Sequence, residues 1–251
     1  MQMARMAVTL TLATAFSVGA AVGAVAAGAP EAGQEAAEIV ERSGVSGGLI
    51  LHIGCGDGEL TAALAGRVLI DRLPEGHLPL ADRTVNLIVG ENPAGIADRE
   101  LMRVLAPGGQ IGSKKGAAWT FRTKPKPETF DEWTHFLYDA SNNAVCHDTA
   151  VDMPYHLQWV GGPQWARSHD HLASVSASVS AGGRIFYIVD EGPIAAVVLQ
   201  PKWRLVARDA FSGVILWKRA IPRWQYHLRG FRSGPSELAL SLIHISEPTR
   251  L

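Results

Sequence analysis

The chain has 251 residues, of which 47% are hydrophobic and 19% are charged, and its formal net charge is −1. This composition is that of a globular protein with room for two domains, and the charge balance gives no electrostatic basis for binding nucleic acid. The two cysteines, Cys55 and Cys146, form neither a CxxC nor a CxxCH motif, so neither a cysteine zinc site nor attached haem is indicated.

The N-terminal region has the pattern of a secretory signal peptide. Residues 7–27 carry no charge, are rich in Ala, Val and Leu, and follow a basic residue, Arg5. Residues 24–26 (AVA) provide the small side chains of a cleavage site. We therefore predict that residues 1–27 direct export to the periplasm or cell envelope. The alternative is a membrane anchor, because the apolar run is long enough to span a bilayer, and membrane contact would then come through this uncleaved segment.

A strand, a glycine-rich turn and a helix are predicted in succession over residues 49–65. Residues 49–53 (LILHI) are mostly apolar, the next five read GCGDG, and residues 59–65 have helical character. Glycine permits a positive φ and a close backbone approach to a ligand, and the start of a helix offers free N–H groups. This succession predicts a nucleotide-binding corner.

The rest of the first domain shows alternating helical and extended patterns. Gly44 ends one helical pattern, and Pro107 with two following glycines ends another. Two prolines in residues 124–127 predict an extended linker. The predicted helices are 34–42 and 99–105, and the predicted strands are 67–70 and 84–89.

Three segments resemble, in the same order, motifs of class I S-adenosylmethionine-dependent methyltransferases. LILHIGCGDG (49–58) is similar to the first motif, LPLADRTVNLIV (78–89) to the fourth strand, and LMRVLAPGG (101–109) to the RVLxPGG turn. The resemblance implies a Rossmann-like α/β domain over residues 31–115 with S-adenosylmethionine as its cofactor. The cofactor-binding residues that it implies are Gly54, Gly56 and Gly58 at the methionine and ribose end, Asp71 at the ribose hydroxyls, and Asp82 near the adenine.

The chain also departs from that family's pattern. His52 stands where the family usually carries an acidic residue, and Asn86 stands where it has Asp. Residues 59–77 have room for one helix and one strand, so a strand–helix unit is missing. Asp71 is then either the ribose-binding acid or the acid that follows the third strand. An exported protein would also lack this donor, which is made in the cytosol. We therefore expect a truncated, degenerate methyltransferase-like domain, and an active methyltransferase is the alternative.

From residue 157 the pattern changes to short strands. A hairpin is predicted around the turn at residues 181–183 (AGG). The predicted strands are 157–160, 173–179, 184–189, 203–207 and 214–218. The last four of these predict one four-stranded antiparallel sheet.

The motif AxDxxxGxxxW, formed by Ala207, Asp209, Gly213 and Trp217, resembles the tryptophan-docking repeat of quinoprotein-type (pyrroloquinoline quinone-like) β-propellers. In that family the glycine permits a tight turn and the tryptophan packs against a neighbouring blade. The resemblance implies that residues 131–239 are the start of an all-β propeller, with Asp209 as a turn residue. It also implies either a dehydrogenase holding pyrroloquinoline quinone with calcium or a non-enzymatic envelope scaffold, and no quinone or calcium ligands are assigned.

Polar and aromatic residues of the second domain offer further alternatives. His169, Asp170 and His171 have the residue types of a divalent-metal site, although loop histidines are more often solvated. Other polar clusters are Trp133-Thr134-His135, Asn142-Asn143 and His147-Asp148. Five tryptophans could stack on a quinone, although packing between blades is the better interpretation for all of them. They are Trp159, Trp165, Trp203, Trp217 and Trp224.

The C-terminal sequence resembles a technical product of DNA sequencing. Residues 240–250 (LSLIHISEPTR) are similar to the translation of a transposase-based library adapter. We expect residues 240–251 to be derived from such an adapter and the natural protein to continue past about Ala239. The predicted organisation is thus a signal peptide (1–27), an α/β domain (31–115), a linker (116–130) and an incomplete propeller (131–239).

Overall fold

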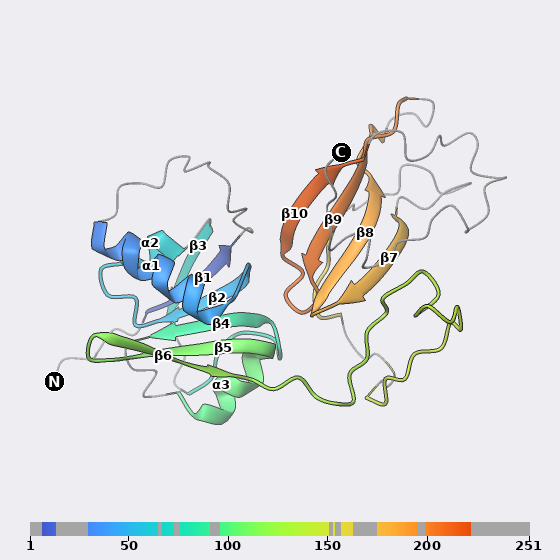
Figure 1. The fold of residues 1–251 in the computed structure, drawn as a ribbon. Helices are drawn as coiled ribbons and strands as arrows, with labels where there is room; N and C mark the ends of the chain where they lie inside the picture. Colours follow the sequence, from blue (N-terminus) through green and yellow to red (C-terminus); the bar gives the residue numbers. More distant parts are fainter. Residues whose placement is uncertain are drawn as a thin grey trace. The chain divides into compact units, whose positions relative to one another are not determined.

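The structure is a computed structural model of the chain, and it describes residues 7–13, 30–64, 67–72, 76–90, 96–150, 153, 157–162, 175–194 and 199–221 (Figure 1). Two compact units divide the chain, Met1–Lys126 and Pro127–Leu251. Among the helices in the described ranges, none has both the length and the apolar character that crossing a membrane requires.

The first unit is a mixed α/β structure, and its described strands form one six-stranded sheet (Figure 1). The strand order across the sheet is β3-β1-β2-β4-β5-β6. In chain order the elements are β1 (Ala7–Ala13), α1 (Pro30–Ser43), β2 (Gly48–Ile53), α2 (Glu59–Leu64), β3 (Arg67–Arg72), β4 (Val85–Gly90), α3 (Asp98–Val104), β5 (Leu105–Lys115) and β6 (Ala118–Thr123).

The centre of this sheet is parallel. Strand β2 pairs in parallel with β4, with Ile50 opposite Leu87 and His52 opposite Val89. Strand β4 in turn pairs in parallel with β5. The α/β character expected of residues 31–115 is therefore confirmed, with residues of β2 and β4 side by side in the parallel part of the sheet.

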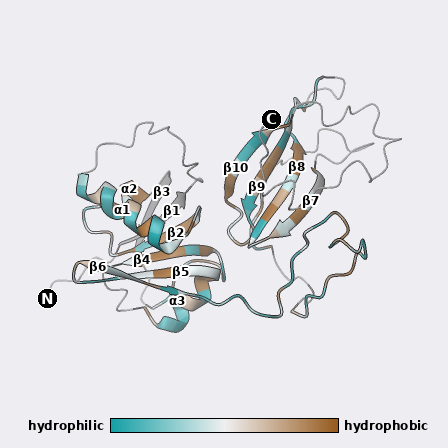
Figure 2. Cartoon of the chain, in the orientation of Figure 1, coloured by the Kyte–Doolittle hydropathy of each residue, from teal (hydrophilic) through white to brown (hydrophobic). Residues whose placement is uncertain are grey.

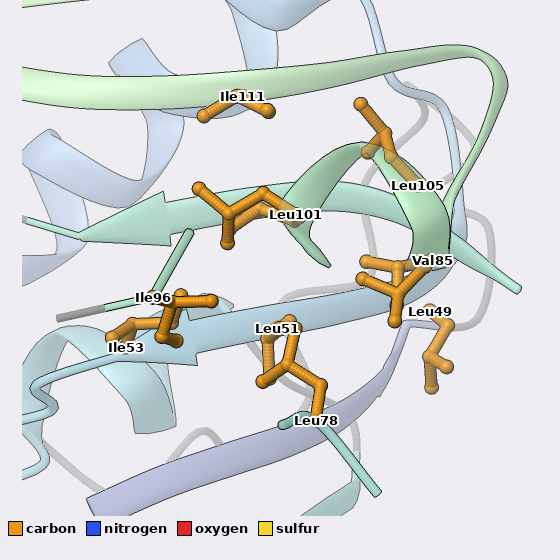
Figure 3. Close-up of a cluster of buried hydrophobic side chains, with 11 residues drawn as sticks. Leu49, Leu51, Ile53, Leu78, Val85, Ile96, Leu101, Leu105 and Ile111 are labelled. Carbon is orange, nitrogen blue, oxygen red and sulfur yellow. The ribbon is translucent and has the colours of Figure 1, made fainter. Parts of the chain in front are cut away.

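Alternating residues of β2 fill two separate cores, one on each face of the sheet. Leu51 belongs to a cluster with Val85, Leu101 and other apolar residues of β4, α3 and β5 (Figure 3). Ile50 belongs to the other cluster, which contains Ile39 of α1. Successive strand residues point to opposite faces, so helices on both sides bury this strand completely.

Strand β1 lies inside the segment that the sequence predicts to be a signal peptide. It pairs antiparallel with β2 on one side and with β3 on the other. This strand was not predicted, because the lack of charge in the segment indicated a leader and not a strand of a sheet. Export of the chain stays a prediction.

The first unit extends past residue 115, so the predicted linker at 116–130 is wrong over its first part. Strand β6 pairs antiparallel with β5, from Gln110 opposite Thr123 to Lys115 opposite Ala118. Trp119 is only 1% exposed and Phe121 packs beside it in the core on the α1 face. These two alternate aromatic residues bury one face of the strand, which explains why the segment joins the sheet.

The described strands of the second unit form one antiparallel sheet with the order β10-β9-β8-β7. The strands are β7 (Val175–Ala181), β8 (Arg184–Asp190), β9 (Trp203–Asp209) and β10 (Ile215–Ala220). Figure 2 shows hydrophobic residues along β8 and β9, the two central strands. Each predicted strand from 173 to 218 corresponds to one of these four, and the described sheet does not close into a barrel or propeller.

The predicted strand at residues 157–160 is wrong, because these residues form no strand in the structure. Leu157 and Val160 are 80% and 85% exposed, whereas Trp159 between them is partly buried. Of the apolar residues that suggested a strand, the one that packs into the structure is Trp159, through its indole ring.

Candidate functional site

The glycine turn at residues 54–58 joins β2 to α2 at the carboxyl end of β2. Gly54, Gly56 and Gly58 have φ values of 75°, 54° and 87°. A Cβ atom on any of them would meet no atom of the described residues within 4 Å. Glycine is therefore required by the left-handed backbone and not by crowding, and the space beside the turn is open.

The turn is closed by its own polar groups. The backbone N–H of Gly58 donates to the carbonyl of Cys55 at 2.8 Å, and the N–H of Glu59 donates to the Asp57 carboxylate at 3.0 Å. This carboxylate at the start of α2 opposes the approach of a phosphate. The turn is consequently better suited to a neutral hydroxyl-bearing ligand than to a pyrophosphate.

A buried polar pair lies between β2 and α2. His52 Nδ1 is 2.7 Å from Thr61 Oγ1, and both side chains are buried. His52 occupies the position at which an acidic residue was expected, and its ring nitrogen contacts a hydroxyl of α2. The sequence marks His52 only as a departure from a pattern and gives no signal for Thr61.

An ion pair supports the same face of the sheet. Glu35 of α1 accepts hydrogen bonds from Lys114 of β5 and from Trp119 Nε1, the latter at 3.0 Å. Burial by itself would raise the pKa of Glu35, but these hydrogen bonds outweigh burial and lower the pKa. The pair joins α1 to β5.

Asp71, the predicted ribose-binding acid, lies in β3. Its Cα faces Val8 of β1, and Val8 in turn faces Ile53, the last residue of β2. Asp71 is thus level with the glycine turn but separated from it by one intervening strand, or about 10 Å across the sheet. The structure brings the three glycines together and does not bring Asp71 beside them.

Asp82 and the glycine turn lie at opposite ends of the parallel strands β2 and β4. It precedes β4, whereas the turn follows β2, and these two strands are parallel. Its carboxylate accepts a hydrogen bond from Arg103 Nη1 at 2.6 Å. The expectation that Asp82 approaches the adenine of a ligand held at the turn is not supported by this placement, because the strand length separates them.

Arg103 and Glu100 of α3 instead hold the loop that contains Asp82. Glu100 Oε1 accepts a hydrogen bond from the Leu78 N–H at 2.7 Å, and Arg103 donates to the carbonyls of Leu78 and Leu80 at 3.0 and 2.9 Å. The hydrogen bond from Arg103 lowers the pKa of Glu100 to about 2. The LPLAD and RVL segments, which resemble methyltransferase motifs, are thus joined to each other structurally.

In the second unit, the indole of Trp159 lies against the turn between β9 and β10. Trp159 Nε1 donates to the carbonyl of Ala210 at 2.9 Å. A Cβ atom on Gly213 would lie only 2.5 Å from the indole, so the close approach requires glycine. The sequence pattern predicted a tight turn at Gly213 and packing between blades for both Trp159 and Trp217, and it did not predict that Trp159 contacts this turn.

A buried arginine completes this contact. Arg208 is 6% exposed and lies over the Trp159 ring, with its guanidinium carbon 5.3 Å from the ring centroid. It donates to Tyr187 Oη at 2.9 Å and to the carbonyl of Gly213. The role of Arg208 was not predicted, because it is one of several charged residues in the β-forming run of β9.

Asp209 is confirmed as a turn residue. Its carboxylate accepts hydrogen bonds from the backbone N–H groups of Phe211 and Ser212 at 3.1 and 2.6 Å. It also accepts one from the Ser212 hydroxyl at 2.7 Å. These bonds hold the turn that presents Gly213 to Trp159.

A Tyr–Asp–His network lies in the segment before β7. Tyr138 Oη donates to Asp131 at 2.5 Å and is 3.2 Å from His147 Nδ1, while the His147 N–H donates to the same carboxylate at 2.7 Å. These bonds lower the pKa of Asp131 to about 2, and the carboxylate raises the pKa of Tyr138 to about 12. Tyr138 has a φ of 72°, which is unusual for a residue with a side chain.

Several sequence candidates lie outside the described residues, namely His169, Asp170, His171, Trp165 and Trp224. Within the described ranges no group of three His, Cys, Asp or Glu side chains is arranged to hold a metal ion. Cys55 and Cys146 are both free thiols.

Comparisons with known proteins identify no relative: no family model, no curated protein and no solved structure matches this chain.

Proposed function

We propose that the chain is part of an exported two-unit protein in which a quinoprotein-like β-propeller carries the activity, as a redox enzyme or as an envelope scaffold. The Rossmann-like unit is an accessory with a degenerate methyltransferase-like fold. The observation that supports this proposal is the docking of Trp159 on the glycine turn at Gly213.

The docking contact supports a repeated architecture because the two tryptophans stand in similar local sequences. Residues 157–159 read LQW, and residues 215–217 of β10 read ILW. Trp159 covers the turn of the described sheet, whereas Trp217 is 37% exposed. If a second sheet had its own glycine turn, Trp217 would cover that turn in the way that Trp159 covers the turn at Gly213.

The natural gene tests this proposal directly. Sequencing it past the codon for Ala239 is expected to reveal further AxDxxxGxxxW repeats, and their absence would contradict the propeller. Equilibrium dialysis of the full-length product with pyrroloquinoline quinone, with and without calcium, then separates the two roles. Calcium-dependent quinone binding indicates a dehydrogenase, and its absence indicates a scaffold.

The second candidate function is binding of S-adenosylmethionine for methyl transfer. The open turn with three glycines in the left-handed region supports it, since aligning a donor with an acceptor requires no general base in principle. Isothermal calorimetry of the chain with S-adenosylmethionine tests this candidate. No heat at high-micromolar donor would remove it.

A further inference from the structure

Strand β1 occupies an unusual place in the sheet of the first unit. Residues 8–12 are paired on both sides, with β2 on one side and β3 on the other (Figure 1). Because β1 is antiparallel to both neighbours, β2 and β3 run in the same direction. An antiparallel strand thus separates two parallel strands that the chain connects through α2.

The two separated strands are already in register with each other. Val8 faces both Ile53 and Asp71, and Leu12 faces both Leu49 and Arg67. The offset between β2 and β3 is 18 residues at both ends (71 − 53 and 67 − 49). Direct pairing of β3 with β2 therefore needs a sideways movement of one strand spacing, about 4.8 Å, and no movement along the strands.

The connection between the two strands permits this movement. Residues 54–66 contain the glycine turn and α2, and a parallel crossover needs about a dozen residues. Consecutive strands of such units are commonly neighbours in the sheet. The intervening β1 is the element that departs from this arrangement.

We propose that β1 is a removable strand, and that β3 pairs directly with β2 once the N-terminal leader has been cleaved. This inference rests on the predicted signal peptide and on hydrolysis of one peptide bond near residues 24–27 by a leader peptidase. Re-pairing satisfies the backbone groups that loss of β1 would otherwise leave open along β2 and β3.

The re-paired sheet places Asp71 beside Ile53, directly before the glycine turn. In the uncleaved chain β1 keeps the acid and the turn apart.

A disulfide trap tests the strand exchange. The variant Leu49→Cys/Arg67→Cys, with Cys55 and Cys146 changed to Ser, has its new cysteines about 10 Å apart across β1. Disulfides require Cα atoms within about 7 Å, so the full chain should not crosslink. Adding Leu10→Pro removes a backbone donor from β1 and is expected to displace it, whereas the matched Leu10→Val change retains it.

All forms carry the two new cysteines at positions 49 and 67. We expect an oxidative crosslink between them when Leu10→Pro is added or when the chain begins at Gly28. We expect none in the full-length double-cysteine chain, with or without Leu10→Val. The proposal is overturned if neither displaced form crosslinks, whether it remains folded with an open slot or loses cooperative unfolding. It is equally overturned if the full-length double-cysteine chain without a change at Leu10 crosslinks to the same extent.

Discussion

The indole of Trp159 and the backbone of Gly213 are in such close contact that no side chain fits between them. Gly213 also has a φ of 72°, so two independent constraints select glycine at this position. Sequence alone indicates only one of these two constraints, the positive φ of a turn. The contact with the indole becomes visible only in the structure.

We expect Gly213→Ala to destabilise the second unit by about 2–4 kcal/mol, which combines the cost of a left-handed alanine with overpacking against the indole. Gly182→Ala is the matched control, because Gly182 has a φ of 58° but open space around its Cα. The control should lose only about 1–2 kcal/mol. Urea unfolding followed by circular dichroism measures both, and equal losses would contradict the docking contact.

The glycine turn of the first unit should behave differently. Gly56→Ala meets no atom, so its expected cost is the backbone strain alone, about 1–2 kcal/mol. Gly33→Ala, at an uncrowded position inside α1, should instead stabilise the unit by about 0.5–1 kcal/mol.

Thermal unfolding with S-adenosylmethionine checks whether the turn binds the donor while β1 is in place. We expect no rise in melting temperature for the parent or for the Gly56 variant, because Asp71 lies one strand too far away. A rise in the parent that the Gly56 variant lacks would show donor binding and overturn the degenerate interpretation.

The carboxylate of Glu100 links α3 to the loop at Leu78, and we expect the stability that it contributes to fall at low pH. The pKa of Glu100 falls from 4.5 to about 2 on folding, so its contribution is fully present above pH 4.5 and is lost as the pH falls towards 2. The lost stability should be about 1–3 kcal/mol. Glu100→Gln should remove this part of the pH dependence, as measured by urea midpoints at pH 6 and pH 3.

The control for this experiment is Glu38→Gln, which breaks an exposed pair with Arg42. Exposed pairs of this kind contribute about 0.3–0.5 kcal/mol, so the pH profile should barely change. A Glu100 variant with the same pH profile as the parent would show that Arg103 does not hold the carboxylate charged.

Tyr138 should set the ionisation of Asp131. Tyr138→Phe removes the first of the hydrogen bonds that hold the pKa of Asp131 near 2, while the backbone bonds from His147 and Glu132 remain. We expect the pKa of Asp131 to rise and yet to stay below its usual value. Carboxyl NMR titration measures the change, with Tyr187→Phe as control because that hydroxyl contacts Arg208. An unchanged titration would show that the hydroxyl does not stabilise the charge.

Periodicity and turn residues predicted many of the local elements, because they depend on neighbours in sequence. The strands β2 and β4 and the four strands of the second unit follow from apolar runs that Gly residues interrupt. β1 was missed because an uncharged apolar run is compatible with a leader, an anchor or a buried strand. Partners far apart in sequence decide between these structures.

The candidate site was predicted less completely for the same reason. The left-handed conformation of Gly54, Gly56 and Gly58 is one that their residue type permits and that a turn between a strand and a helix favours. The position of Asp71 depends on which strand lies beside β2, and that of Asp82 depends on the direction of β4, and neither is encoded in local sequence. Arg208 and Thr61 acquire their contacts only when distant strands and helices meet.

Trp119 gives the first unit an optical reporter of its own. It is the only tryptophan among residues 1–126, and it is almost completely enclosed beneath α1 with its N–H bound to Glu35. The difference in emission between the parent and Trp119→Phe therefore isolates light from this unit alone. A red shift of that difference spectrum marks the moment at which α1 leaves the sheet, even while the second unit stays folded.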